Sequence, residues 1–224
     1  MKQYTFIFIF IFNSLVFSQT PVSKTLGEFS KLKVYDLINV ELIESTENKI
    51  EITGKNTKDV LVVQKNNTLK IKMVINKYFS GEETFIKLYY TKINTIDVNE
   101  GAIVTAQTPF NQYELELKSQ EGGEIKVSVN TKVLTVKSVT GGKIQVSGFS
   151  KTQNIDINTA GVYLGANLQA ETSKVDIKAG GQAEVNSSEH IDVKILAGGN
   201  LTVIGKPKQI KQRKFAGGKI IYKN

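Results

Sequence analysis

Asp156 and Asp176 are the two residues whose type and spacing most nearly resemble a pair of working carboxylates. Paired carboxylates can act as general acid and base on a glycosidic bond, and they can also hold a calcium ion. Each stands four residues before a pair of small residues, and the same position is held elsewhere by Lys118, Lys137, Lys194 and Arg213. What this position can do therefore depends on the element that repeats it.

The repeated element is a glycine pair that recurs through the second half of the chain. Successive first members are 19, 19, 20, 18 and 19 residues apart. A constant period near 19 indicates one supersecondary unit that is repeated and stacked, because a unit of this size cannot bury its own apolar face. We expect the glycines to form tight turns, several at positive φ. The marks are Gly122-Gly123, Gly141-Gly142, Ala160-Gly161, Gly180-Gly181, Gly198-Gly199 and Gly217-Gly218.

The segments on both sides of each mark alternate between apolar and polar residues. Leu134 and Val136 precede one mark, and Ile144 and Val146 follow it. Period two indicates strands with one buried face, and regular spacing favours stacked coils over isolated hairpins. In the coil marked by Gly161, Leu164 and Ala166 are expected to fill the apolar columns. We predict an all-β fold, a single-stranded parallel, right-handed β-helix-like solenoid with coils of about 19 residues and an irregular N-terminal β cap.

In such a stack Asp156 and Asp176 are neighbours, about one strand spacing apart. Two like charges at that distance destabilise each other unless a cation or a flanking lysine compensates. Lys137 and Lys194 bracket the pair, which favours a solvated charge ladder. A calcium-linked or glycan-binding pair is the alternative, and hydrolysis is a more remote one.

The N-terminus is typical of a secretory signal peptide. Lys2 supplies a positive start, residues 4–17 are almost wholly apolar, and cleavage is expected before Gln19. The run is shorter than a membrane span requires, so no transmembrane segment is expected after cleavage. We expect residues 1–18 to be the signal and 19–224 one domain, with the cap at 27–98 and the glycine-marked repeats at 99–224. Such a protein is exported to the periplasm, the outer surface or the medium.

Composition argues against several classes of function. Without Lys2 the chain carries 28 basic and 21 acidic residues, a balance of +7, but Arg213 is its only arginine. Nucleic-acid readers depend on arginine, so no nucleic-acid role is expected. The chain has no cysteine, and His190 is its only histidine, which excludes histidine-cluster and cysteine zinc sites. We expect no metal, no cofactor and no disulfide.

Aromatic residues offer a second candidate binding surface. Tyr78 precedes Phe79 in an expected loop, and Tyr89 precedes Tyr90 at an expected strand end. Exposed aromatic faces suit the apolar faces of sugars, so Tyr78 and Tyr89 are candidate ligand-binding residues. Alternation requires that one of Tyr89 and Tyr90 be buried, which makes core packing the competing interpretation.

The order of motifs resembles a known family. The motifs are Phe29, Leu32 and Val34, then Asn39-Val40-Glu41-Leu42, then Ile50-Glu51-Ile52-Thr53-Gly54, then Thr68-Leu69-Lys70-Ile71, followed by the glycine marks. Together they look like the head GIN domain of putative auto-transporter adhesins. The resemblance implies a secreted or envelope protein with a β-helix-like fold, and it supplies no catalytic residues. One departure is that the family often carries Gly-Ser-Gly followed by Asp, whereas here Lys, Glu, Gln or Asn follows the mark.

These observations lead to two expectations of different class. The favoured one is a nonenzymatic exported scaffold or adhesin that binds a glycan or another cell-surface component. The alternative is a carbohydrate-binding or carbohydrate-active β-helix with Asp156 and Asp176 on its working face. Exposed end strands also make self-association possible, because an open edge offers unpaired backbone groups.

Overall fold

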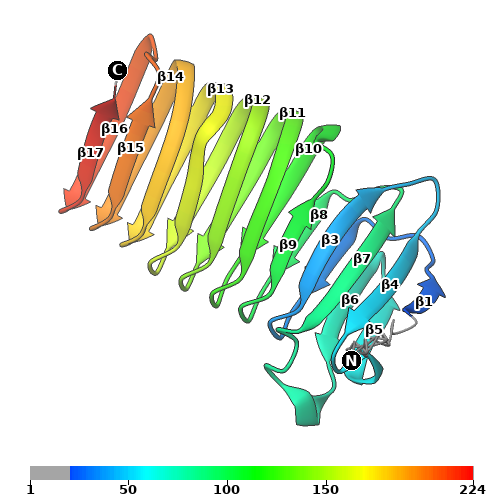
Figure 1. Ribbon diagram of the computed structural model, residues 1–224. Coiled ribbons are helices and arrows are strands. Elements are labelled where there is room, and N and C mark those ends of the chain that lie inside the picture. Colours follow the sequence, from blue (N-terminus) through cyan, green and yellow to red (C-terminus); the bar gives the residue numbers. More distant parts are fainter. Residues whose placement is uncertain (1–20, 224) are drawn as a thin grey trace, which may run out of the picture.

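A computed structural model describes residues 21–223 as a β solenoid closed at its N-terminal end by antiparallel strands (Figure 1). The predicted signal peptide, residues 1–18, lies outside the described residues. Within 21–223, helical structure is confined to two short 3-10 turns, η1 (Thr57–Asp59) and η2 (Ile75–Lys77). None of the helical segments in this part of the chain has the length and apolar character needed to cross a membrane.

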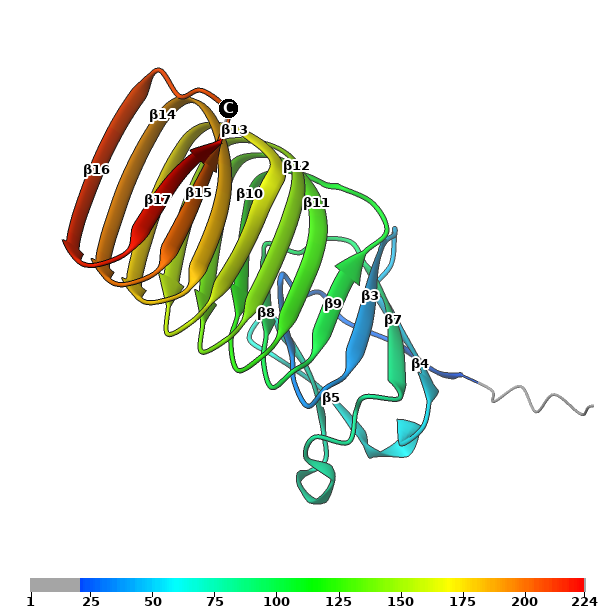
Figure 2. The ribbon, with the colours of Figure 1, turned by 60° about the vertical axis from the view of Figure 1, so that its left-hand side comes forward.

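The glycine-marked repeats form a stack of parallel coils. Long strands bend from one wall of the solenoid to the other, and a tight glycine turn then starts the next strand (Figure 2). We call the wall that precedes the glycine turns wall A and the wall that follows them wall B. Pairing is parallel throughout, for example Leu134 with Gln153 on wall A and Glu124 with Lys143 on wall B. The strands are β10 (Phe110–Ser119), β11 (Glu124–Val139), β12 (Lys143–Asn158), β13 (Val162–Ala179), β14 (Gln182–Ala197), β15 (Asn200–Ile204), β16 (Gln209–Ala216) and β17 (Lys219–Lys223).

Three further coils lie upstream, but not in chain order. β2 (Lys31–Val34) lies between β6 (Thr68–Met73) and β8 (Thr95–Val98) on wall A, and all three are parallel. On wall B, β3 (Asn39–Glu44) lies between β7 (Thr84–Tyr90) and β9 (Ile103–Ala106) in the same way. Segment 27–98 therefore contributes regular coils to the stack as well as a cap. Glu100-Gly101, which joins β8 to β9, has positive φ at both residues, 53° and 68°.

The irregular part of the N-terminal region is an antiparallel layer. β4 (Lys49–Gly54) runs antiparallel to β7, and β5 (Val60–Lys65) runs antiparallel to β6. β1 (Val22–Thr25) then pairs antiparallel with β4. This layer covers the strand edges of the β6–β7 coil, which otherwise present unpaired backbone groups.

The last coil shows how the core ends at the other side of the solenoid. Its inward positions on β16 include Gln212 and Lys214, where the preceding coil has Val193 and Ile195. The Tyr222 hydroxyl donates a hydrogen bond of 3.0 Å to Gln212 Oε1 across the coil. Lys219 and Lys223 lie on β17, and lysine on an edge strand discourages pairing with another chain. The expected self-association stays a prediction.

Apolar columns fill the space between the walls. Leu117, Val136, Ile155, Val175 and Val193 occupy one column on wall A, and each is at most 3% exposed. Each new coil thus continues the core of the one before it, and the core grows along the stack by burial of aliphatic side chains.

One coil fills the core differently from its neighbours. Tyr163 takes the inward position paired with Ile144, and Gly165 lies under its ring. The expectation that Leu164 and Ala166 fill the apolar columns is therefore wrong, because both side chains are only partly buried. The ring leaves space for no second large side chain, and the buried hydroxyl requires a partner. It donates a hydrogen bond of 2.9 Å to Oε1 of Gln153, which stands where the coil before has Leu134.

The two glycines of a mark are required for different reasons. Gly141 has φ 70°, a conformation that most side chains disfavour, but a Cβ there would meet nothing within 4 Å. Gly142 does not have a positive φ, yet a Cβ there would lie 2.3 Å from the carbonyl oxygen of Ser119 in the preceding coil. The predicted tight turns are confirmed, and the second glycine permits close approach between coils.

This difference predicts the outcome of two neighbouring substitutions. Gly142→Ala should cost about 3 kcal/mol of unfolding free energy, because the added methyl group must displace backbone. Gly141→Asn should cost less than about 1 kcal/mol, because asparagine tolerates positive φ. Urea unfolding of both variants tests the order, and an equal or reversed order would show that coil contact is not the constraint at Gly142.

Two acidic groups meet where the N-terminal coils turn. Asp36 is fully buried, and its carboxylate accepts hydrogen bonds from the backbone N–H of Met73 at 2.9 Å and of Phe79 at 3.3 Å. Oε2 of Glu100 is shielded from solvent and has no hydrogen-bond partner among the described residues. Burial and the nearby Asp36 charge raise the pKa of Glu100 above its ordinary value.

The raised pKa predicts how stability changes with pH. When the pKa of an acid is higher in the folded state than in the unfolded state, the acid begins to lower the stability of the fold as pH rises above the unfolded-state pKa. The loss of stability is complete above the folded-state pKa. Glu100→Gln should therefore raise Tm at pH 7 by about 2 °C. The gain should vanish at pH 3, where Glu100 is protonated in both states. Thermal unfolding at both pH values tests this, and a gain that is equal at pH 3 would contradict it.

Candidate functional site

A single column of charged side chains runs along the outer surface of wall A. We call it the charge ladder. Its members pair one with the next in adjacent parallel strands, so it extends for about 38 Å at the usual strand spacing. The predicted part from Lys118 to Arg213 is confirmed, and the structure adds three residues upstream. In order the ladder is Lys70, Lys33, Asp97, Lys118, Lys137, Asp156, Asp176, Lys194 and Arg213.

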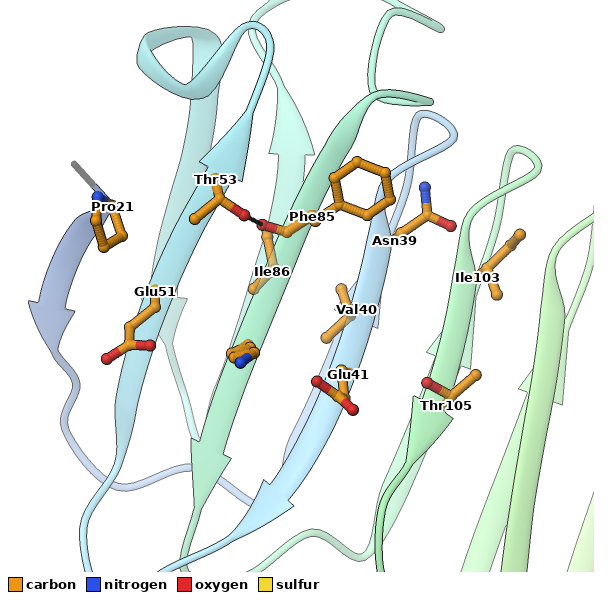
Figure 3. A pocket seen from close by; sticks show the side chains of 11 residues that line it. Pro21, Asn39, Val40, Glu41, Glu51, Thr53, Phe85, Ile86, Ile103 and Thr105 are labelled. Atoms are coloured by element: carbon orange, nitrogen blue, oxygen red, sulfur yellow. Dashed lines mark hydrogen bonds between the residues drawn. The ribbon is translucent and has the colours of Figure 1, made fainter. Parts of the chain in front are cut away.

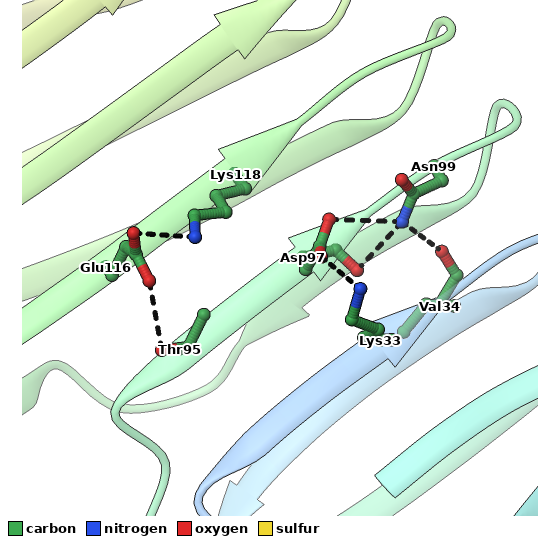
Figure 4. Close-up of polar contacts among 7 residues, drawn as sticks. All are labelled: Lys33, Val34, Thr95, Asp97, Asn99, Glu116 and Lys118. Carbon is green, nitrogen blue, oxygen red and sulfur yellow. Dashed lines mark hydrogen bonds and ion pairs between the residues drawn. The ribbon is translucent and has the colours of Figure 1, made fainter. Parts of the chain in front are cut away.

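The upstream acidic residues of wall A are neutralised by their neighbours (Figure 4). Lys33 Nζ lies 2.9 Å from Asp97 Oδ2, and Asn99 Nδ2 donates to Asp97 Oδ1 at 3.2 Å. Partial burial opposes the charge of Lys33, but the contact with Asp97 outweighs it and raises the pKa of Lys33. In the next coil Lys118 Nζ lies 2.7 Å from Glu116 Oε1.

Asp156 and Asp176 are direct partners in adjacent strands, as predicted. Lys137 and Lys194 flank them in the ladder. Lys178 Nζ lies 2.6 Å from Asp156 Oδ2, whereas Asp156 Oδ1 is shielded and has no hydrogen-bond partner among the described residues. Lys178 thus offsets part of the repulsion that two adjacent carboxylates create, while Lys137 and Lys194 are the next members of the ladder on either side.

A shallow hollow of about 210 Å³ lies over this pair. Pockets that enclose a small ligand are usually about 300–1,000 Å³, so this hollow is too small to enclose one and is a shallow contact surface on an open wall. In residues 21–223 no three histidine or acidic side chains come together as a metal site would require. The hollow is lined by Glu116, Thr135, Val136, Lys137, Asn154, Ile155, Asp156, Lys174 and Asp176.

The two candidate aromatic residues do not come together. Tyr78 lies in the loop before β7 and is 47% exposed, while Tyr89 lies near the far end of β7. The Phe79 N–H donates to Asp36, which holds the Tyr78 loop near the beginning of β7, and Thr84 to Tyr89 alone spans about 17 Å of strand. One sugar ring does not reach across that length. Tyr90 is the buried member of its pair and stacks on Phe110 at a centroid distance of 5.6 Å. The Tyr89 hydroxyl donates to Glu51 Oε2 at 3.3 Å.

Wall B carries a larger hollow that the sequence analysis missed, with a volume of about 470 Å³. Its side chains stand side by side on β4, β7, β3 and β9 (Figure 3). Phe85 is 53% exposed and Ile103 37%, and Glu41 and Lys87 lie beside them. Alternation identifies Phe85 as outward-facing, but only the out-of-order position of β3 places Asn39 between Phe85 and Ile103 and so joins β7 and β9 in one surface.

Comparison with known proteins identifies the fold and the family. Residues 28–207 match the family described as "Putative auto-transporter adhesin, head GIN domain". Among curated proteins, none matches the chain.

Solved structures resemble the chain over nearly its whole length. A putative adhesin from Bacteroides fragilis superposes with a TM-score of 0.83 at 20% identity, covering 92% of this chain and 98% of that one. A putative adhesin from Parabacteroides distasonis gives 0.71 at 15% identity, with coverage of 91% and 96%. A putative lipid binding protein from the same species gives 0.63 at 13% identity, with coverage of 90% and 96%. At these identities the likeness concerns the fold.

The ladder makes a prediction about stability. Asp176→Asn removes one of two adjacent like charges, and Asp156→Asn removes the partner of Lys178, so each should change the unfolding free energy by less than about 1 kcal/mol. Asp176→Asn should be neutral or stabilising and Asp156→Asn slightly destabilising, with both effects smaller in 1 M salt. Chemical unfolding measures this. A loss of several kcal/mol in either variant would show that the pair is a structural requirement.

Proposed function

Because the chain belongs to the putative auto-transporter adhesin, head GIN domain family, we propose that it is a nonenzymatic cell-surface protein that binds another surface component through the outer walls of its solenoid. The charge ladder on wall A is the observation that carries this proposal. The core occupies the inward columns of the stacked coils, which leaves the outward columns free to carry recognition.

The shape of the outer surface supports binding over a broad area. The hollow over Asp156 on wall A and the hollow beside Phe85 on wall B are both open and shallow. On wall A the ladder continues across successive coils from Asp156 to Arg213 on β16. A partner laid along the solenoid can contact several coils at once. Repeated weak contacts of this kind add up when they are made by one molecule.

A position at the cell surface agrees with the family's description and with the predicted signal peptide at residues 1–18. Two of the structural relatives are named as putative adhesins and one as a putative lipid binding protein. The last of these names adds lipids to surface glycans as a partner class to test for this chain.

The carbohydrate-active alternative depends on Asp156 and Asp176. Adjacent carboxylates are also what a glycosidase requires, and the hollow above them is the observation that favours this alternative. A binding role accounts for the same open hollow, because binding does not require a groove that encloses the bond to be cut.

Attachment tests the proposal directly. Cells that express the full chain should lose it to protease added outside, and they should attach to a glycan-coated or cell-coated surface more than cells without it. Cells that carry the same expression vector without the gene for this protein serve as the matched control. Protection from protease in intact cells would contradict a surface position, and equal attachment by both strains would contradict adhesion.

A polysaccharide panel separates the two candidate functions. The purified protein should release no new reducing ends or unsaturated products from any member of the panel, and Asp156→Ala should leave this result unchanged. A product that wild-type protein forms and that Asp156→Ala does not would replace the binding proposal with the enzymatic one.

A further inference from the structure

A second hollow on wall A is lined by lysines, and we call it the lysine hollow. It lies over β5, β6 and β2, where the ladder begins, and its volume is about 480 Å³. Four of its seven lining residues are lysines, and none is acidic. The lining residues are Lys33, Val63, Lys65, Asn66, Thr68, Lys70 and Lys72.

Strand pairing from two directions brings these lysines together. In β6 the apolar side chains Leu69, Ile71 and Met73 are buried, so Thr68, Lys70 and Lys72 face outward. On one side parallel β2 sets Lys33 beside Lys70. On the other side antiparallel β5 sets Val63 beside Lys70 and Lys65 beside Thr68. The cluster is therefore built from the β5–β6 hairpin and from β2, which is distant from that hairpin in sequence.

The positive charge of the hollow is largely uncompensated. Lys33 is paired with Asp97, but in residues 21–223 no carboxylate lies within 4.0 Å of the ammonium group of Lys65, Lys70 or Lys72. Lys70 Nζ instead lies 5.5 Å from the centre of the Tyr35 ring. Like charges gathered on one sheet face destabilise it, so this arrangement suits an anionic partner that neutralises them.

We propose that the lysine hollow binds a segment of an anionic glycan that carries carboxylate or sulfate groups. This rests on the proposed function and names the class of partner. Lysines are separate point charges, which suit anionic groups spaced along a chain, whereas close phosphate recognition favours arginine forks. Asn66 and Thr68 offer hydrogen-bonding groups for sugar hydroxyls. Val63, 45% exposed, gives the hollow an apolar part for a sugar face.

The position of the hollow favours a polymer over a small free anion. Lys70 and Lys33 are the first two members of the ladder, which continues past Asp97, the ion-pair partner of Lys33, to Lys118 and Lys137. A chain held in the hollow can extend along this column and meet Lys118 and Lys137 about two and three strand spacings beyond Lys33. A single small anion uses only the first contacts.

A charge-matched pair of variants tests the inference. The hollow variant is Lys65→Gln/Lys70→Gln/Lys72→Gln. The control is Lys126→Gln/Lys132→Gln/Lys151→Gln, which removes three exposed lysines outside the hollow and leaves the net charge equal to that of the hollow variant. Binding of full-length mature protein is measured at 150 mM salt to polygalacturonate, dextran sulfate, neutral dextran and phosphatidylglycerol vesicles, after thermal unfolding has verified the fold of each variant.

The expected result is binding of wild-type protein to polygalacturonate or dextran sulfate and not to dextran. Affinity should fall about tenfold or more in the hollow variant and less than about threefold in the control, because long-range attraction is reduced equally in both. Equal loss in both variants, binding to vesicles alone, or no binding to either anionic polymer would overturn the inference.

Failure of this inference can be told apart from failure of the proposed function. If cells with the hollow variant still attach as well as wild-type cells, the lysine hollow is not the binding site although adhesion stands. If wild-type cells do not attach, adhesion itself fails, whatever the polymers bind.

Discussion

Close contact between the backbones of successive coils is the constraint on which the rest of this structure depends. Each coil must turn sharply and then lie one strand spacing from the coil before it. At Gly142 the turn comes so close that a single methyl group would lie 2.3 Å from the Ser119 carbonyl oxygen. Ser138 reinforces the same turn, since its hydroxyl donates to the Gly142 carbonyl oxygen. The glycine pairs therefore fix the period, and the period fixes which side chains stack.

Stacking divides the side chains into two sets with different tasks. Inward columns such as Leu117 to Val193 must be apolar and of matching size, because each member packs against the next. Where the large Tyr163 enters the core, Gln153 replaces an aliphatic residue at a neighbouring inward position and accepts the hydrogen bond of the Tyr163 hydroxyl. Outward columns have no such restriction, and there the chain places its charges. Recognition by this protein is accordingly a matter of how outward columns of neighbouring coils combine, and the charge ladder and the lysine hollow are two such combinations.

The sequence allows the repeated coils and part of the ladder to be predicted, because period and alternation are local signals. Asp156 beside Asp176 follows from counting residues between glycine pairs. The antiparallel pairing of β5 with β6 is a local feature, since only the turn at Asn66-Asn67 separates the two strands. The lysine hollow does not follow in this way, because it requires β2 to insert between β6 and β8, which no local pattern encodes. The separation of Tyr78 from Tyr89 depends likewise on where the loop before β7 leaves the stack. Long-range pairing thus decided the surfaces that the sequence analysis missed.

Lysine reactivity in the presence of polygalacturonate tests most directly whether recognition resides in the outward columns of wall A. Acetylation of the intact protein, followed by mass spectrometry, reports each lysine separately. The account predicts protection of Lys65, Lys70 and Lys72, decreasing along the ladder through Lys137, while Lys126 on wall B stays fully reactive. Uniform protection of all lysines, or protection centred on wall B, would contradict it.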